Sequence, residues 1–320
     1  MSIQRVQLGA RGPWVPRLCF GTLTMGPLQR GLSPQEGARL LCAAAARGVD
    51  FVDTAEIYGT YPHIALALRE YPAMTVCTKT YAHDAAGAAQ ALARAQEELG
   101  RRYIDIFLLH EQESEHTLRG HEGALRYFAQ KKAEGVIGAI GISTHHVAAV
   151  RAAATFGRAF GGLDVVHPIL NREGLGIADG TRQEMEEACQ CAHDAGLGVF
   201  AMKPLGGGHL LDAPQSAFAY VLTRPYVDAL AVGMQSEAEI DYNLTVCEGQ
   251  APAPAVRAAC KQAPRRLMVH DWCGGCGACA ARCDQQAVTV HAGRAQVDEA
   301  RCVRCGYCAT VCPQFCIKVI

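Results

Sequence analysis

The sequence has few of the features that mark membrane, secreted or nucleic-acid-binding proteins. Its longest stretch without a formal charge, near residues 136–150, contains Gly, Ser, Thr and two His and is shorter than the ~18 residues that a membrane span needs. No secretory-type apolar segment stands at the N-terminus, so a disulfide-rich secreted scaffold has no support. We therefore expect a cytoplasmic protein whose cysteines are reduced or bound to metal.

Charge of either sign is also scarce. Only 19% of the 320 residues are charged, and 30 Lys and Arg face 31 Asp and Glu. A balance this even indicates neither a nucleic-acid partner nor a membrane-surface partner. The chain is 50% hydrophobic, which is enough for a large core and too apolar for a disordered protein.

Cysteine is the residue that the chain has in excess. Of the 16 cysteines, seven lie in residues 1–263 and nine in residues 264–320. A Pro- and Ala-rich stretch at 250–257 precedes this change and is typical of a connector. We predict two domains, 1–263 and 264–320, with the boundary near Pro264.

Up to about residue 235 the sequence repeats one unit, a short apolar run followed by a turn and a segment of helical periodicity. The eight candidate strands are 18–22, 49–53, 75–79, 104–110, 137–143, 163–167, 198–202 and 229–233. Eight such units in one domain favour an α/β fold of the (β/α)8 TIM-barrel type. The alternative is a doubly wound open sheet, but no Gly-rich dinucleotide fingerprint follows the first strand. Residues 6–16 predict a small hairpin before the barrel.

The second domain carries two runs of cysteine with the spacing of bacterial two-cluster ferredoxins. The runs are Cys273, Cys276, Cys279 and Cys283, then Cys302, Cys305, Cys308 and Cys312. In this pattern the fourth cysteine of each run binds the other cluster. One [4Fe-4S] cluster should therefore take Cys273, Cys276, Cys279 and Cys312, and the other Cys302, Cys305, Cys308 and Cys283.

Two structural zinc sites are the alternative for these cysteines, but zinc sites usually combine separated pairs of ligands. Two details depart from the strictest ferredoxin pattern, since Asp284 and not Pro follows Cys283, and Cys316 is left over. We expect Cys316 to be a small buried residue. The segment resembles a bacterial-type ferredoxin, which implies a small α+β iron-sulfur domain that passes single electrons.

Four polar residues stand where predicted barrel strands end, namely Asp53, Tyr58, Lys79 and His110. Active residues of such barrels lie at the carboxyl ends of the strands. In this order the four residues resemble the catalytic tetrad of the aldo-keto reductases, and the resemblance runs from about residue 5 to residue 243. It implies that Tyr58 gives or takes a proton, that Lys79 and Asp53 tune Tyr58, and that His110 orients a carbonyl oxygen.

The same resemblance implies a nicotinamide site. Its expected residues are Ser143, Thr144, His167, Asn171, Lys203, Pro204, Leu205, Gly206, Gly233, Gln235, Ser236, Glu239 and Asn243. Met202 stands where many members have an aromatic residue. The segment 233–243 has three acids and no base, which favours NAD(H) over NADP(H), because a ribose 2′-phosphate needs Lys or Arg.

Together the two domains predict an oxidoreductase. The barrel would act on a small-molecule carbonyl or alcohol, while the two clusters exchange single electrons with a redox partner protein. One alternative is an electron-transfer or redox-sensing protein whose barrel binds a ligand or a non-nicotinamide cofactor without turnover. Another is a set of clusters with a structural role only.

Overall fold

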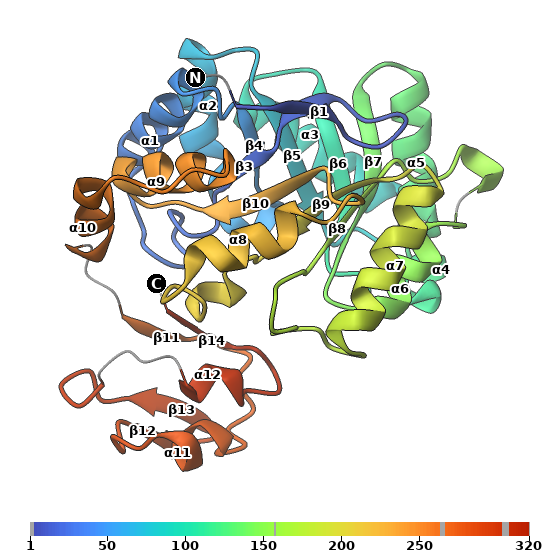
Figure 1. The fold of residues 1–320 in the computed structure, drawn as a ribbon. Coiled ribbons are helices and arrows are strands. Elements are labelled where there is room, and N and C mark those ends of the chain that lie inside the picture. The colour runs from blue at the N-terminus through green and yellow to red at the C-terminus, as the bar shows by residue number, and fades with distance from the viewer. Residues whose placement is uncertain (1–2, 157, 263–265, 303–306, 320) are drawn as a thin grey trace.

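The computed structural model describes residues 3–156, 158–262, 266–302 and 307–319. Eight parallel strands close into a barrel in the order β10-β3-β4-β5-β6-β7-β8-β9 (Figure 1). They are β3 (Leu18–Gly21), β4 (Phe51–Asp53), β5 (Thr75–Thr80), β6 (Ile104–Leu109), β7 (Ile137–Thr144), β8 (Val165–Pro168), β9 (Gly198–Met202) and β10 (Ala229–Gly233). The eight predicted strands and the TIM-barrel class are confirmed, and the open-sheet alternative is excluded.

Helices surround the barrel. They are α1 (Pro34–Ala46), α2 (Tyr61–Glu70), α3 (Ala85–Leu99), α4 (Glu115–Gly120), α5 (Glu122–Ala133), α6 (Val147–Ala153), α7 (Arg182–Asp194), α8 (Pro214–Leu222), α9 (Glu237–Cys247) and α10 (Pro254–Gln262). Short 3-10 turns form η1 (Glu56–Tyr58), η2 (Arg158–Phe160) and η3 (Gly206–Gly208).

The start of α1 illustrates how the sequence sets a helix boundary. The Ser33 hydroxyl accepts a hydrogen bond from the Glu36 amide at 3.3 Å, and the Glu36 carboxylate accepts one from the Ser33 amide at 2.9 Å. This reciprocal pair satisfies two backbone donors that a helix start leaves unpaired. Pro34, the first residue of the helix, has no amide hydrogen to satisfy there.

The stretch 250–257 differs from its prediction as a connector, because helix α10 begins inside it at Pro254. Proline suits the first turn of a helix, and the alanines that follow are good helix formers. Composition alone therefore did not reveal this helix. The predicted boundary at residue 264 lies outside the described residues.

The barrel interior is filled by apolar side chains and closed at its amino end by a hairpin. β1 (Arg5–Gln7) pairs antiparallel with β2 (Trp14–Pro16), which confirms the predicted hairpin. Leu8 and Val15 of this hairpin pack against Phe51 and Phe200 inside the barrel. The amino end is thus sealed, and the carboxyl ends of the strands remain for a site.

The second domain is built from two small antiparallel sheets and two short helices. β11 (Leu267–Val269) pairs with β14 (Ile317–Val319), and β12 (Val288–His291) pairs with β13 (Arg294–Val297). Helices α11 (Ala278–Arg282) and α12 (Tyr307–Thr310) complete it. Figure 1 shows this domain next to α8, with β11 and β14 nearest the barrel.

The domain contacts the barrel through β14 and η3. The His209 Nε2 atom lies 3.1 Å from the Ile317 carbonyl oxygen. A Cβ on Gly208, whose φ is +95°, would come within 2.4 Å of the Val319 carbonyl oxygen. A larger residue than glycine would therefore push β14 away from the barrel.

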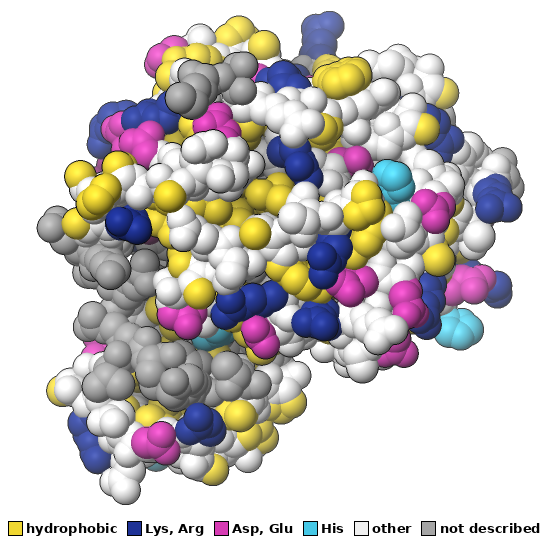
Figure 2. Space-filling model, in the orientation of Figure 1, with side chains coloured by type: hydrophobic (Ala, Val, Ile, Leu, Met, Phe, Trp, Pro, Cys, Tyr) yellow, Lys and Arg dark blue, Asp and Glu magenta, His cyan; other side chains and the backbone are white. Residues whose placement is uncertain are grey.

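Charges of both signs are mixed on the face of the molecule in Figure 2, where Lys and Arg lie beside Asp and Glu. None of the helices in the described ranges is long and apolar enough to cross a bilayer.

Candidate functional site

The four predicted catalytic residues come together at the carboxyl end of the barrel. Asp53 is the last residue of β4, Tyr58 ends η1, Lys79 lies near the end of β5 and His110 follows β6. β4 pairs with β5, and β5 pairs with β6. Because parallel neighbours bring their carboxyl ends to one rim, four positions far apart in the sequence meet in one place.

The centre of the group is a buried ion pair. The Lys79 Nζ atom lies 2.6 Å from the Asp53 Oδ1 atom and donates a second hydrogen bond to the Thr54 carbonyl oxygen at 2.7 Å. It also lies 5.1 Å from the centre of the Tyr58 ring. The Tyr58 hydroxyl is 3.4 Å from His110 Nε2. The arrangement places one hydroxyl between a fixed cation and an imidazole.

Local contacts fix the turn that presents Tyr58. The hydroxyls of Thr54 and Thr60, on either side of η1, lie 2.7 Å apart, and Glu56 accepts a hydrogen bond from Thr80 at 2.7 Å. Gly59 ends the turn with a φ of +65°, in the left-handed region that favours glycine. These contacts hold the Tyr58 side chain toward the barrel centre.

Burial governs the proton affinities of the group. It raises the pKa of Tyr58 to about 12, although the Lys79 charge opposes this shift. Burial also disfavours the charged form of Lys79, but Asp53, together with Tyr58 and Cys77, outweighs burial and raises the Lys79 pKa. Burial first, and the Lys79 charge second, lower the His110 pKa well below its ordinary value. At neutral pH the site therefore holds a protonated tyrosine, a lysine cation and a neutral histidine.

His167, predicted to contact the cofactor, also lies beside this group. Its Nδ1 atom donates to the Phe200 carbonyl oxygen at 2.6 Å, and its Nε2 atom lies 3.8 Å from Asp53 Oδ2. The ring stacks on Phe200 with centroids 3.9 Å apart. Burial lowers its pKa to about 4, so the ring is neutral at physiological pH and exposes an acceptor toward the site.

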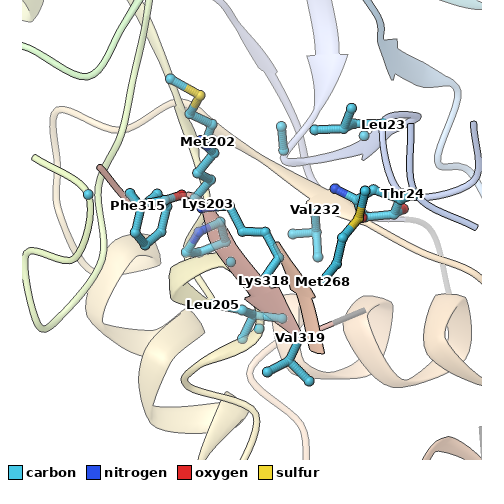
Figure 3. Close-up of a pocket in the computed structure, with 18 of the residues that line it drawn as sticks. Leu23, Thr24, Met202, Lys203, Leu205, Val232, Met268, Phe315, Lys318 and Val319 are labelled. Atoms are coloured by element: carbon cyan, nitrogen blue, oxygen red, sulfur yellow. Dashed lines mark hydrogen bonds between the residues drawn. The ribbon is translucent and has the colours of Figure 1, made fainter. Parts of the chain in front are cut away.

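A cavity of about 1470 Å³ opens above these residues. Asp53, Tyr58, Lys79 and His110 line one part of it. The second domain lines another part through Met268, Cys312, Phe315, Lys318 and Val319. Figure 3 shows Met202, Lys203 and Leu205 of the barrel beside Phe315, Lys318 and Met268 of that domain. The pocket is therefore built jointly by the two domains.

The structure divides the predicted cofactor residues into two groups. Those that line the pocket are His167, Lys203, Pro204, Leu205, Gly233, Gln235, Glu239 and Asn243. Ser143, Thr144, Asn171, Gly206 and Ser236 lie outside its lining, and the polar side chains among them hold nearby backbone. The Thr144 hydroxyl donates to the Gln112 carbonyl at 2.5 Å, and Ser236 caps α9. A nicotinamide role for either group stays a prediction.

The acidic side chains of segment 233–243 interact with other residues of the barrel, which the sequence alone did not indicate. Arg47 bonds Glu237 at 2.9 Å and Asp241 at 2.7 Å, and Glu239 accepts a hydrogen bond from the Gln235 amide at 2.8 Å. Arg257 lines the same pocket. Because bases from elsewhere in the chain reach this region, the argument for NAD(H) from the segment's own charge loses weight.

The cysteines of the second domain gather around its small core. Cys279 and Cys308 are buried in that core, and Cys273, Cys302 and Cys312 pack against it. Cys276 is exposed, Cys283 packs against the same core, and Cys305 lies outside the described residues. Within the described ranges no three His, Cys, Asp or Glu side chains converge as ligands of a single metal ion do. The four thiolates of a four-iron cubane each bind a different iron, so they lie further apart than the ligands of one metal ion.

The donor set fits an iron-sulfur cluster. The Ala295 amide donates to Cys273 Sγ at 3.4 Å, and the Ala287 amide donates to Cys283 Sγ at 3.3 Å. Amide hydrogen bonds to cysteine sulfur are among the features that tune such clusters. Those from Ala295 and Gly275 also lower the Cys273 pKa, which favours the thiolate that iron binds.

Cys316 is buried, as expected for a small core residue. It stands four residues after Cys312, as Ala287 stands four residues after Cys283, and both are 1% exposed. Its sulfur lies 3.4 Å from Cys312 Sγ. Cys316 thus holds the position in the second half of the domain that alanine holds in the first.

Comparison with known proteins agrees with this geometry. The model of the Aldo/keto reductase family matches residues 17–216, which is more than half of the chain. The chain belongs to the aldo/keto reductase family. The model of the 4Fe-4S binding domain matches residues 295–318. This aldo/keto reductase thus carries a ferredoxin-type domain after the barrel.

Two curated relatives carry the same family name. A probable aldo-keto reductase 1 from Glycine max is 24% identical over 65% of this chain and 61% of its own length. An aldo-keto reductase from a Mycobacterium strain is 29% identical over 57% of this chain and 62% of its own. The chain thus spans a little over three fifths of the length of these relatives.

Solved structures share the fold. A putative aldo-keto reductase from Pseudomonas aeruginosa has a TM-score of 0.65 at 22% identity, over 77% of this chain and 94% of that one. A thermostable aldo-keto reductase in complex with the inhibitor epalrestat has a TM-score of 0.63 at 22% identity, over 80% of this chain and 98% of that one.

Several residues of the pocket in this aldo/keto reductase were not foreseen. Tyr81 stacks on His110 with ring centroids 4.7 Å apart and donates to Glu111 at 2.8 Å. Tyr81 directly follows the end of β5, so its position could have identified it as a residue of the pocket. Phe315 and Lys318 carried no such signal, because nothing in the sequence says where the second domain docks.

Proposed function

We propose that this aldo/keto reductase interconverts a small carbonyl compound and its alcohol at Tyr58, with electrons exchanged through two [4Fe-4S] clusters. The observation that carries the proposal is the shared pocket. Tyr58 and Lys79 line it from the barrel, and Cys312, a proposed cluster ligand, lines it from the second domain. A cluster held by Cys312 would border the same cavity as the reacting group.

The chain's own residues account for the proton at oxygen. A carbonyl that becomes an alcohol gains two electrons and two protons, one at oxygen and one at carbon. The proton at carbon would come with the electrons as the hydride of a nicotinamide, or from solvent where the electrons come singly from the clusters. Tyr58 would give the proton at oxygen, which its raised pKa of about 12 keeps available at neutral pH. As the proton leaves, the Lys79 cation stabilises the tyrosinate, and Asp53 holds that cation in place at 2.6 Å. Neutral His110, 3.4 Å from the Tyr58 hydroxyl, would orient the carbonyl oxygen.

When bound, each cluster passes one electron at a time, whereas a nicotinamide passes a hydride. Cys273, Cys276, Cys279 and Cys312 would hold the cluster nearer the pocket, and Cys302, Cys305, Cys308 and Cys283 the other. NAD(H) or NADP(H) would lie along Pro204, Gly233 and Gln235. We further infer a redox partner protein and a cytoplasmic location.

The first test is Tyr58→Phe in the cluster-loaded protein under anaerobic conditions. Phenylalanine keeps the ring and removes the proton donor, so turnover of an aldehyde panel should fall about 10² to 10⁴ fold. Cluster absorbance and thermal stability should not change. Full activity in this variant would overturn the catalytic role of Tyr58. The proton would then come from another group of the barrel.

The second test asks how electrons reach the pocket. The oxidised protein is mixed with NADH, with NADPH or with a chemical one-electron reductant, and cluster absorbance is followed. We expect the one-electron reductant to bleach the clusters and the reduced protein to reduce substrate without added nicotinamide. If substrate is reduced only by NADH or NADPH and the clusters stay oxidised throughout turnover, the clusters do not take part in the reaction.

A further inference from the structure

Two lysines from different domains lie together in the pocket wall. Lys203 follows β9 of the barrel, and Lys318 belongs to β14 of the second domain. Their ammonium groups lie 5.3 Å and 3.0 Å from the centre of the same ring, that of Phe315. Figure 3 shows the three side chains close together. Two lysine amino groups thus lie against one aromatic ring in the wall of the cavity.

Neither lysine has a carboxylate partner among the described residues. Lys203 Nζ lies 2.6 Å from His145 Nε2, and Lys318 Nζ donates to the Phe315 carbonyl at 2.5 Å. Glu111 accepts from Tyr81 and lies 3.8 Å from His145 Nδ1, and its charge raises the pKa of both lysines without pairing with either. A buried lysine without a paired carboxylate is costly to protonate, and an anionic ligand would offset that cost.

The proton affinities of the two lysines differ. Burial lowers the pKa of Lys203 to about 8, and burial together with the Lys203 charge lowers that of Lys318 to about 5. At neutral pH Lys203 is therefore largely charged and Lys318 neutral, and an anion bound beside them would favour proton uptake by Lys318. Burial and both lysines also lower the His145 pKa, so its neutral ring accepts from Lys203. Arg294 is already paired with Asp271 at 2.8 Å.

The backbone is shaped to bring the two lysines together. Lys203 has a φ of +57°, a conformation that residues with a side chain rarely adopt. A Cβ on Gly207 would lie 3.0 Å from Lys318 Cδ and 3.2 Å from Phe315 Cζ. Glycine at that position leaves room for the Lys318 side chain to reach the pocket.

We propose that Lys203 and Lys318 bind the anionic group, a carboxylate or a phosphate, of the molecule that reacts at Tyr58. This inference rests on the proposed function for the identity of the reacting group. It assigns the substrate class as carbonyl or alcohol compounds with an anionic end. It also makes the second domain part of the substrate site, because Lys318 comes from that domain.

The binding test uses simple anions and the cluster-loaded full chain. Inorganic phosphate and acetate are titrated by calorimetry into wild type, Lys203→Met and Lys318→Met. Methionine keeps the stem of the side chain and removes the charge. Lys131→Met is the control, since Lys131 pairs with Glu134 on the surface at 2.7 Å. We expect about tenfold or greater loss of anion affinity in the two pocket variants and no change in the control.

Cluster absorbance confirms that each variant is folded, and Lys318→Arg should restore binding in part. Wild-type anion affinity in Lys318→Met, with a shifted cluster potential instead, would overturn the proposal and make Lys318 a partner of the cluster. Anion binding abolished by saturating NADH or NADPH would also overturn it, because the anion would then occupy the place of the dinucleotide phosphates.

Turnover separates this proposal from the proposed function. 4-Carboxybenzaldehyde and benzaldehyde are compared, since they differ by one anionic group. We expect a lower KM for the acid, and loss of that preference in Lys203→Met and Lys318→Met. Equal KM values for the two aldehydes would overturn the substrate class. If neither aldehyde reacts but the lysines still bind acetate, the reaction assigned to Tyr58 fails and the anion site stands.

Discussion

The pocket has two walls that carry lysines and differ in one respect. On the barrel side the Lys79 cation is paired with Asp53 at 2.6 Å, and both are buried. On the side of the second domain Lys203 and Lys318 have only neutral hydrogen-bond partners. The paired Lys79 charge is fixed by the protein itself and lies beside the Tyr58 ring. Lys203 and Lys318 would gain a counter-charge from a ligand, so the comparison separates the proposed machinery of the reaction from the proposed recognition of its substrate.

The largest effect should come from removing the carboxylate that pairs with Lys79 in the barrel wall. Asp53→Asn keeps the shape of the side chain and leaves the Lys79 charge buried without a carboxylate. Breaking a buried pair in this way costs about 3–5 kcal/mol, and turnover should fall at least about 10² fold because the cation no longer stays beside Tyr58.

Thermal unfolding and aldehyde turnover check this prediction. Asp241→Asn is the matched control, because Asp241 pairs with Arg47 in a partly exposed position and should cost no more than about 1 kcal/mol. If Asp53→Asn is as stable and active as the control, Asp53 does not stabilise the Lys79 charge. The two walls then do not differ in the way described above.

The next effect concerns the contact that brings the two walls together. Gly208→Ala puts a Cβ 2.4 Å from the Val319 carbonyl oxygen at a φ of +95°, so β14 must move away from the barrel. Gly249→Ala is the control, since Gly249 also has a positive φ, +74°, but meets nothing within 4 Å. Both variants carry about 1 kcal/mol of backbone strain, and only Gly208→Ala should speed proteolysis between the domains and raise the KM for anionic substrate.

A fall in pH should lower the unfolding free energy of the protein through His167. The pKa of this buried histidine is about 4 in the folded protein, against 6.5 ordinarily. Between pH 6.5 and 4 the unfolded chain therefore takes up a proton that the folded chain does not, and the unfolding free energy falls by about 1.4 kcal/mol per pH unit. Urea unfolding at pH 6.5, 5.5 and 4.5 should show a shallower pH dependence in His167→Gln. Identical slopes in both proteins would mean that His167 is not the group responsible.

The two walls also differ in how far the sequence predicts them. Asp53, Tyr58, Lys79 and His110 each stand at or just after a strand end, and the closure of a parallel barrel brings strand ends together whatever the loops do. The eight strands were predictable for the same reason, because buried parallel strands are continuous apolar runs. The local sequence pattern was therefore enough to predict residues whose position is set by the end of a strand.

The other wall depends on how the two domains dock, which no local pattern encodes. Lys203 was predicted for a cofactor site, but its neighbour Lys318 sits in a strand whose contact with η3 exists only in the folded chain. Arg47 illustrates the same limit, since its pairing with Glu237 and Asp241 spans most of the barrel sequence. Charge counted along one segment therefore gave an incomplete picture of the charge in space.

The smallest effect is expected at Cys316, where the two cluster halves can be compared directly. Its position matches that of Ala287, and both side chains are 1% exposed. Cys316→Ala should therefore change the thermal midpoint little, cost less than about 1 kcal/mol, and leave iron and sulfide content unchanged. Cys312→Ala, one turn away, should lose about half of the iron because it removes a proposed ligand of one of two clusters. Loss of iron in Cys316→Ala with retention in Cys312→Ala would reverse the ligand assignment, and place the sulfur that bounds the pocket outside the cluster.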